Sequence, residues 1–415
     1  MSTFTTIFLF AVIAGLALQL WLAARQAAHI ISHADTVPAA FAAGISLEQH
    51  QTAARYSIAR LGIERWDLVL GSAVLLGWTV AGGIGWLDDA IASIGLGTLW
   101  HGVALVIAVV LVGTIIDLPL SIWRTFGVEA RFGFNRTTPG GFAKDRLLGL
   151  VLGLILGVPL VAAILWLMAR AGQLWWLWAW LLWMTFSLFI TWAYPIWIAP
   201  LFNRFKSLDD AALRARLERL LQRCGFTSNG MYVMDGSRRS AHGNAYFTGF
   251  GANKRIVFFD TLLDGLEADE VEAVLAHELG HFKRRHVVKM LAISALMSLL
   301  GLALLGWLAG QQWFYAGLGV TRPGDAAALV LFMLVAPVFS LFANPLLAWL
   351  SRRHEFEADD FAAAQTDPRH LISGLVKMYR DNASTLTPDP LYSAFHHSHP
   401  PAPVRIANLS SKIPA

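Results

Sequence analysis

An HExxH motif, His277-Glu278-Leu-Gly-His281, occupies residues 277–281 of a chain that otherwise consists largely of apolar runs. Two histidines four apart on a helix lie about 40° apart around its axis, so both imidazoles can reach one ion. Glu278 can then face a water bound to that ion and act as general base. The alternative is a chance pentapeptide on a surface helix. The acidic first turn and helical apolar spacing of residues 267–276 predict that the motif lies on a helix, which favours a zinc hydrolase.

The composition indicates that much of the chain faces lipid. Of the 415 residues, 56% are hydrophobic and only 14% are charged, whereas soluble globular proteins have about 45–50% apolar and about 25% charged residues. The net charge is +4, and the basic residues lie beside hydrophobic runs, which favours membrane flanks over nucleic acid. Cys224 is the only cysteine, so an intrachain disulfide and a cysteine-based zinc site are both excluded. Any metal must bind to histidines and carboxylates.

Several apolar runs reach the length of roughly 20 residues that a bilayer core requires. The first lacks a basic leader and a cleavage site, and we expect it to be a retained transmembrane helix. Pro195 and Pro200 should bend or end the fifth run, and Asn344-Pro345 should kink the seventh. The seven predicted spans are residues 6–25, 67–87, 101–123, 146–170, 174–200, 288–310 and 326–350.

The charges of the loops predict an orientation in the membrane. Arginine and lysine gather after the first, third, fifth and seventh spans, whereas the loop after the second carries Asp88 and Asp89 without a basic residue. The positive-inside rule therefore places the N-terminus outside and the C-terminus in the cytoplasm. Asp117 lies within the third span, and we interpret it as a polar group near a helix end, close to Arg124, rather than as a functional intramembrane carboxylate.

Two stretches are polar enough to fold in water, and they divide the chain into four parts. The first contains five transmembrane helices with cytoplasmic loops, the second the HExxH helix, the third two further spans, and the fourth the remaining metal ligand. The predicted parts are residues 1–202, 203–287, 288–350 and 351–415.

The second part is expected to combine helices with strands. A basic amphipathic helix, with Leu213, Leu217, Leu220 and Leu221 on one face, should precede three extended segments. The extended segments are residues 231–234, the alternating stretch 244–250 and residues 255–260.

A catalytic zinc normally has three protein ligands and one open position, so the two histidines need a partner. On a helix that begins near residue 351, Glu355 and Asp359 share a face while Glu357 points roughly opposite. A glutamate ligand with an aspartate one turn later is a reasonable arrangement, because an acid beside a zinc-bound histidine fixes its tautomer. The alternative is a solvated acidic turn that balances two neighbouring arginines. The candidates for the third ligand are His286, His354, Glu355, Glu357, Asp359, His396, His397 and His399.

Several blocks in the same order resemble one known family. With the HExxH motif they are Phe132–Thr138, Pro200–Asn203, Asp235–Tyr246, Lys254–Leu263, Glu355–Asp359 and His399-Pro-Pro. Together they resemble the CAAX prenyl protease 1 family of integral-membrane zinc metallopeptidases. The resemblance covers most of the chain and is far more specific than HExxH alone.

The resemblance implies a fold and a metal site. The fold would be mostly α, with seven transmembrane helices forming an α-barrel around a water-filled chamber and a gluzincin-like α+β metalloprotease part on the cytoplasmic side. His277, His281 and Glu355 would bind one zinc ion per chain, and Glu278 would be the general base. Asp359 would complete this catalytic group as the supporting acid.

The resemblance also implies how a substrate is held. Residues 244–250 would form an edge strand that pairs with an extended peptide by β-augmentation. His399 and Arg405 would face the scissile carbonyl or the carboxylates of the metal site. The residues assigned to substrate binding are Asn244, Ala245, Tyr246, Phe247 and Thr248.

Family members cleave peptide bonds near a C-terminal prenylated cysteine. The short, Ala- and Gly-rich chain is typical of a bacterial protein, and bacteria generally lack protein prenylation, so membrane or misfolded proteins form a second class of expected substrate. We therefore expect a multi-pass protein of the bacterial inner membrane with its zinc site in the cytoplasm. Its expected partners are the lipid bilayer and peptide or protein substrates, including lipid-modified ones, and not nucleic acid.

Two other classes of protein share part of this pattern. In an intramembrane-cleaving metalloprotease the HExxH motif lies inside an apolar span, but here Phe282-Lys-Arg-Arg-His286 follows it at once. The predicted site therefore lies at the membrane interface. A transporter or channel with a structural metal would explain seven spans, but it would not explain a glutamate placed as a base beside two histidines.

Overall fold

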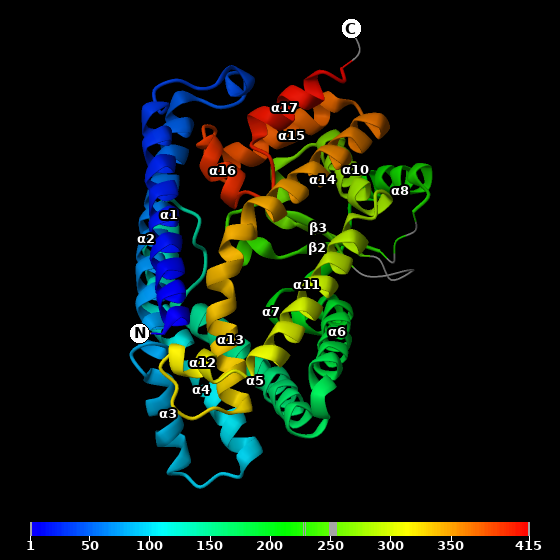
Figure 1. Ribbon diagram of the computed structural model, residues 1–415. Coiled ribbons are helices and arrows are strands. Elements are labelled where there is room, and N and C mark those ends of the chain that lie inside the picture. The colour runs from blue at the N-terminus through cyan, green and yellow to red at the C-terminus, as the bar shows by residue number, and fades with distance from the viewer. Residues whose placement is uncertain (1, 227, 229, 249–254, 414–415) are drawn as a thin grey trace.

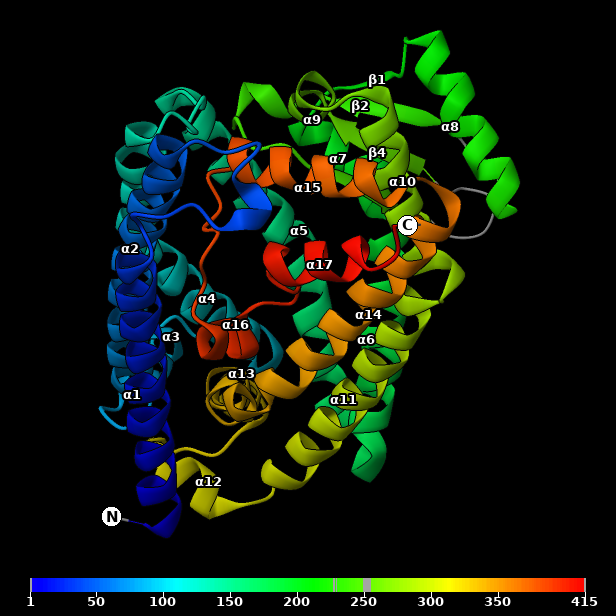
Figure 2. The ribbon, with the colours of Figure 1, turned by 90° about the horizontal axis from the view of Figure 1, so that it is seen from above.

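Long helices stand side by side and a smaller mixed part lies at one end of them in the computed structural model, which describes residues 2–226, 228, 230–248 and 255–413 (Figure 1). Viewed from above, most of the long helices stand around the periphery of the molecule (Figure 2). Among the described residues, six helices are long and apolar enough to cross a membrane, or up to seven if a bent pair counts as one span. The helices that form these candidate spans are α1 (Thr3–Ser32), α2 (Leu47–Trp78), α3 (Gly83–Ala92), α4 (Thr98–Ile122), α5 (Pro139–Arg170), α6 (Trp175–Ala193), α11 (His286–Leu308), α13 (Asp325–Ser340) and α14 (Asn344–Gln365).

The second predicted span, residues 67–87, is not one straight helix. α2 ends at Trp78, α3 begins at Gly83, and the two helices are bent by 55°. Gly82 has a φ of +81°, a left-handed conformation that glycine adopts without steric cost. The predicted span is therefore a bent pair of helices, and its break was not apparent in the sequence because the residues around it are themselves apolar.

The prolines act where the sequence predicts. Pro195 lies in a π-helical turn, Tyr194–Ile198, which follows α6 and leads into the short helix α7 (Ala199–Phe202). Pro345 lies in the first turn of α14, directly after a 3-10 turn that separates α14 from α13. The seventh predicted span is therefore interrupted at Asn344-Pro345, and its continuation carries the acidic segment out of the apolar run.

A second π-helical turn, Trp123–Glu129, extends the third span beyond its predicted end. Arg124 in this turn pairs with Asp67 of α2 at 3.2 Å. The described residues include no ion pair between Arg124 and Asp117, so the expected proximity of these two groups is not seen as a contact.

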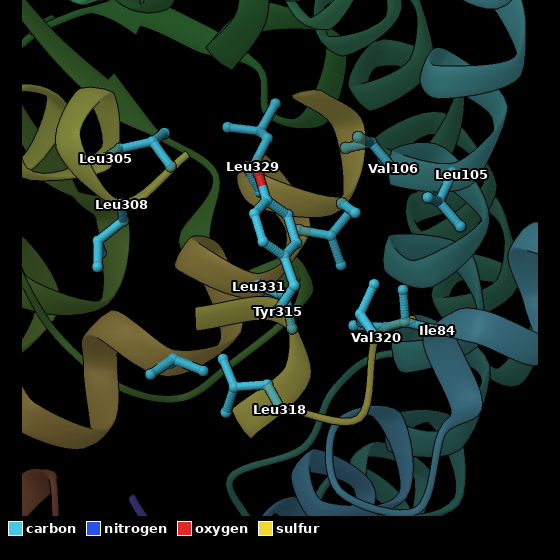
Figure 3. Packing of buried hydrophobic residues seen from close by; sticks show 14 of the residues in the cluster. Ile84, Leu105, Val106, Leu305, Leu308, Tyr315, Leu318, Val320, Leu329 and Leu331 are labelled. Carbon is cyan, nitrogen blue, oxygen red and sulfur yellow. The ribbon is translucent and has the colours of Figure 1, made fainter. Parts of the chain in front are cut away.

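A buried apolar core joins the membrane helices, and it includes α12 (Gln312–Gly317). Figure 3 shows Leu305 and Leu308 of α11 near Tyr315 of α12 and Leu329 of α13. The Tyr315 hydroxyl donates to the Ala309 carbonyl at 2.8 Å, which satisfies its polar group among apolar neighbours. This core fixes α11 and α13, the two helices that continue from the segments carrying the candidate site.

A four-stranded sheet forms the centre of the mixed part. Its order is β1-β2-β4-β3, in which β2 and β4 are parallel and the outer pairs are antiparallel. β3 therefore lies at one edge of the sheet. The strands are β1 (Phe205–Ser207), β2 (Met231–Met234), β3 (Ala245–Thr248) and β4 (Arg255–Phe259).

These strands confirm the predicted extended segments, with three differences. β1 was not predicted, and Asp260, expected at the end of a strand, instead begins α9 (Asp260–Gly265). Within residues 244–250, β3 covers 245–248, and residues 249 and 250 lie outside the described part.

Helices cover the sheet and share one apolar core with it. The four predicted leucines of the amphipathic helix are all buried, on α8. The same core takes residues from both polar stretches of the chain, because Leu275 and Ala362 both belong to it. The remaining helices of this part are α8 (Ala211–Cys224), α10 (Ala268–Lys283), α15 (Pro368–Asp381), α16 (Pro390–His396) and α17 (Ala402–Ser410).

Candidate metal centre

The HExxH motif lies on α10, as its flanking residues predict. The helix begins with a reciprocal cap between Glu267 and Glu270, and Lys377 of α15 lies 2.8 Å from the Glu270 carboxylate. Buried residues then follow on every side of α10, because it packs between the sheet, α14 and α15. The cap thus fixes the start of a helix whose later turns carry the two histidines.

A glycine brings α14 against α10. A Cβ atom at Gly280 would lie 2.9 Å from the Cα atom of Ala358, closer than real Cβ contacts allow. Only glycine therefore permits this approach of the two helices. The contact places Glu355 and Asp359, which lie on either side of Ala358, next to the motif.

Three ligand atoms converge between these helices. The Nε2 atoms of His277 and His281 lie 3.2 Å apart. Glu355 places Oε2 3.5 Å from His277 Nε2 and Oε1 3.3 Å from His281 Nε2. Among the described residues, His277, His281 and Glu355 form the group whose ligand atoms could hold one metal ion, all within 4.8 Å of one another.

The geometry of these three groups fits a small divalent cation. A tetrahedral zinc centre with bonds of about 2.0–2.1 Å has ligand atoms about 3.3–3.4 Å apart, which agrees with the separations of 3.2, 3.3 and 3.5 Å. The Glu355 Oε2 atom is buried and makes no hydrogen bond within the described chain. Its nearest charged neighbours are the Nη1 atom of Arg405 and the Nε2 atom of His277, each 3.5 Å away, so this oxygen can still form a shorter bond to a metal ion.

The charge around His277 also fits a cation. Burial alone would lower the pKa of His277, but its contacts with Asp359 and Glu355 raise that pKa to about 9. The carboxylates therefore favour positive charge at this position, which a divalent cation would supply.

Asp359 and Arg405 support the ligands from behind. Asp359 is fully buried, and its Oδ1 atom lies 2.8 Å from the Nδ1 atom of His277. Arg405 of α17 donates from Nε to Asp359 Oδ2 at 2.8 Å, and its Nη1 atom lies 3.5 Å from Glu355. Burial would lower the pKa of Arg405, but Asp359 raises it, so the guanidinium stays charged. Asp359 can thus hold the His277 tautomer that leaves Nε2 free for a metal.

The other residues considered as ligands lie elsewhere. The Nδ1 atom of His286 is 3.0 Å from the Nδ1 atom of His281, and its Nε2 atom is 3.0 Å from Glu357. His354 stacks on His286 with ring centroids 4.1 Å apart. These three residues therefore lie on the far side of His281 from Glu355, where they can orient its ring. Sequence reasoning named His286 only as one candidate for the third ligand and did not predict this supporting position.

The tail histidines divide into two groups. His397 binds the Ser393 hydroxyl through Nδ1 at 3.0 Å, and burial, with His396 close by, lowers its pKa to about 4. His399 is largely exposed, yet its Nε2 atom lies 3.4 Å from Glu355 Oε1. Of the tail histidines, His399 is therefore the one that reaches the candidate centre.

Glu278 is half-buried, whereas the histidine before it is buried. Successive residues on a helix differ by about 100° in direction. The carboxylate of Glu278 therefore points to a different side of α10 from His277, where it can meet a water molecule that approaches the ligand cluster.

The edge strand lies next to the motif. The ring of Phe247 is 4.2 Å from the ring of Phe282, the residue that follows His281. Asn244 is exposed directly before β3, and its carbonyl accepts from Phe259 of β4 at 2.9 Å. β4 occupies one edge of β3, and no described strand pairs with the other. The register also pairs Thr248 with Arg255.

A polar network that sequence reasoning missed anchors the start of this strand. His242 stacks on Phe134 at 4.2 Å, and its Nε2 atom lies 3.4 Å from Glu129. Tyr56 of α2 donates to Glu129 at 2.7 Å, and Asn382 accepts from the Gly243 amide at 3.0 Å. The network joins membrane helices to the candidate substrate strand. Its residues are far apart in the sequence, so no local pattern could predict it.

Comparisons with known proteins agree on one relationship. Residues 26–204 match a family model described as CAAX prenyl protease N-terminal, five membrane helices, and residues 207–413 match peptidase family M48. The chain is 36% identical over 326 residues to CAAX prenyl protease 1 homolog of Taenia solium, covering 72% of this chain and 69% of that one.

Two further relatives extend the comparison. CAAX prenyl protease 1 homolog of Homo sapiens is 33% identical over 333 residues, covering 71% of this chain and 70% of the relative. The crystal structure of Ste24p from S. mikatae superposes with a TM-score of 0.91 at 27% identity, covering 99% of both chains.

Proposed function

Because this chain belongs to peptidase family M48 and is a membrane metalloprotease, we propose that its metal is zinc and that His277, His281 and Glu355 bind it. The predicted family, fold class and peptidase activity are confirmed by these relationships. The observation that carries the proposal is the convergence of the three ligand atoms beside Glu278. Nitrogen ligands disfavour calcium and magnesium, which prefer oxygen ligands.

Different residues of the chain would have different roles in hydrolysis. When bound, zinc polarises a carbonyl group and lowers the pKa of water towards 7. Glu278 would take a proton from the attacking water and deliver it to the leaving amine. His399, next to Glu355, would donate to the charge that develops on the scissile carbonyl. Asp359 and Arg405 would keep His277 and Glu355 in place.

The substrates of this protease are peptides or proteins, and we propose that they include lipid-modified chains. The same C-terminal peptide would be offered with and without a prenyl group on its cysteine. We expect a higher kcat/KM for the prenylated peptide. Equal values would direct the search to unmodified membrane or misfolded proteins, and a Glu278→Gln variant could trap these in cells.

The proposed orientation has the metal centre in the cytoplasm of a bacterium and the N-terminus outside. Reporter fusions would test it. A reporter that is active only in the cytoplasm should function after residue 415 and within 203–287, and it should fail within 311–325. The first two positions lie after the fifth and seventh spans, where arginine residues gather. The opposite pattern would overturn the orientation drawn from the arginine and lysine counts.

Thr248→Pro should raise KM or abolish cleavage while metal content and membrane insertion persist. Proline removes the Thr248 N–H group, which the register directs towards Arg255 of β4, and so distorts the strand whose open edge a substrate would pair with. Asn244→Ala should reduce activity more than Lys206→Ala, because Asn244 lies exposed at the start of β3 and can hold a substrate backbone. Steady-state kinetics and metal analysis would be measured together.

The paired measurements separate two roles for β3. If the strand serves only the core, Thr248→Pro should lose metal as well as activity. A folded variant with normal metal content and normal KM would contradict the edge-strand proposal.

A further inference from the structure

An arginine-lined cavity lies where the span that contains α6 ends. Its volume is about 340 Å³, and Arg204, Arg255, Asn203, Tyr232 and Tyr246 are among its lining residues. The cavity lies between the turn after α6 and the face of the sheet opposite its packed core. No acidic residue lines it among the described residues. The cavity thus combines two guanidinium groups with aromatic walls.

Both arginines retain donors for a ligand. Arg255 donates from Nη1 to the Pro195 carbonyl at 3.4 Å, and its guanidinium lies 5.4 Å from the centroid of the Tyr232 ring. Arg204 uses its backbone N–H to bind Asp235 at 2.7 Å, while in the described part of the chain its side chain has no ion pair or hydrogen bond. A guanidinium presents five N–H donors, so most donors of this pair remain available.

The acids at this end of the span have other partners. Asp235 lies 3.8 Å from Arg238, and Asp145 lies 2.6 Å from Arg239. Arg238 also donates to the Phe202 carbonyl at 2.8 Å, at the end of α7. Capping of α7 therefore accounts for Arg238, and pairing accounts for Arg239. The Arg204 side chain has neither a capping role nor a carboxylate partner among the described residues.

The position of the cavity indicates the source of an anionic ligand. The candidate span covers Gly172–Phe202, and Asn203 and Arg204 follow its last residue. Trp192 and Trp197, close to this end, are 39% and 54% exposed, with ring centroids 5.0 Å apart. Tryptophans and basic residues at the end of a span are typical of the headgroup level of a bilayer.

We propose that this cavity binds the phosphate group of an anionic phospholipid, with Arg204 and Arg255 as its ligands. Guanidinium groups bind phosphate oxygens through paired hydrogen bonds, and a lipid places its phosphate at the depth where the span ends. Tyr246 belongs to β3, so the headgroup would lie against the back of the edge strand. The site is separate from the metal centre and does not depend on the proposed function.

Native mass spectrometry of the full chain in a phosphorus-free detergent tests this site. The wild type should retain one phosphatidylglycerol molecule, and Arg204→Gln/Arg255→Gln should weaken its affinity roughly tenfold or more, because basic residues at the membrane surface attract anionic headgroups. Lys206→Gln removes one positive charge from exposed β1, as Arg204→Gln alone does from the cavity, and should leave the affinity unchanged within about twofold. Metal content verifies that each variant is folded. If the double variant does not fold, the single Arg204→Gln variant takes its place in the same measurement.

Three further ligands identify what the cavity recognises. Diacylglycerol, which lacks phosphate, should bind equally to wild type and double variant. In one contrary result, inorganic phosphate binds with the affinity of phosphatidylglycerol and loses that affinity in the double variant. This result would assign the cavity to free phosphate and overturn the lipid proposal. Equal affinity of wild type and double variant for phosphatidylglycerol would also overturn it. A third result would also overturn it. In that result the double variant would bind the lipid as the wild type does, but its KM would rise for a peptide with a free C-terminal carboxylate and not for the amide of that peptide.

Discussion

Glu278→Gln is expected to bind metal as the wild type does and to lose kcat by about 100- to 10,000-fold, the usual contribution of a positioned general base. The substitution keeps the size of the side chain but removes its ability to accept a proton. Glu278 is not one of the three groups whose ligand atoms converge, so metal affinity should be preserved. Metal analysis and peptide hydrolysis on the same preparation would measure both quantities.

Glu218→Gln provides the matched control, because Glu218 is exposed on α8 and is not one of the candidate metal ligands. It should retain both metal and activity. If Glu278→Gln kept its kcat, Glu278 would not be the base. If it lost metal together with activity, its role would be in metal binding or in folding.

The second large effect concerns the ligands. His277→Ala, His281→Ala and Glu355→Ala should each lose the metal, because the loss of one of three protein ligands leaves an ion poorly held. His286→Ala and Glu357→Ala should retain it, since these side chains lie behind His281. Elemental analysis should give about one metal ion per wild-type chain, the stoichiometry of a single catalytic site.

Asp359 offers a graded test of the same arrangement. Asp359→Asn should weaken metal affinity by about 10- to 100-fold, the usual effect of removing a supporting partner of a ligand. Asp360→Asn is its control, because Asp360 pairs on the outer side of α14 with Lys412 at 3.3 Å. The ligand assignment would be wrong if Glu355→Ala kept full metal while Glu357→Ala or His286→Ala lost it.

The parts of the site that follow from helical spacing could be predicted from the sequence. His277 and His281 are one turn apart on α10, and Glu355 and Asp359 are one turn apart on α14. Periodicity could not pair the two helices, however, because their contact depends on the absence of a side chain at Gly280. Periodicity alone therefore left several candidates for the third ligand, and the family resemblance reduced these candidates to Glu355.

For the fold, too, features set by nearby residues could be predicted, whereas features set by distant residues could not. Apolar runs located the membrane helices, and Pro345 located the break before α14. The bend at Gly82 and the π-helical turn Trp123–Glu129 were not predicted, because the flanking residues continue a helical pattern. β1 was missed because three residues are too few for a periodic signal, and its pairing with β2 is non-local.

Stepwise addition of zinc to metal-free protein, with bound metal and peptide hydrolysis followed together, tests the central claim most directly. The account predicts that hydrolysis rises in proportion to bound zinc and stops rising at one ion per chain. It also predicts that His281→Ala shows neither tight binding nor hydrolysis over the same range. Hydrolysis by the metal-free protein, or a wild-type level of hydrolysis in His281→Ala, would contradict the account.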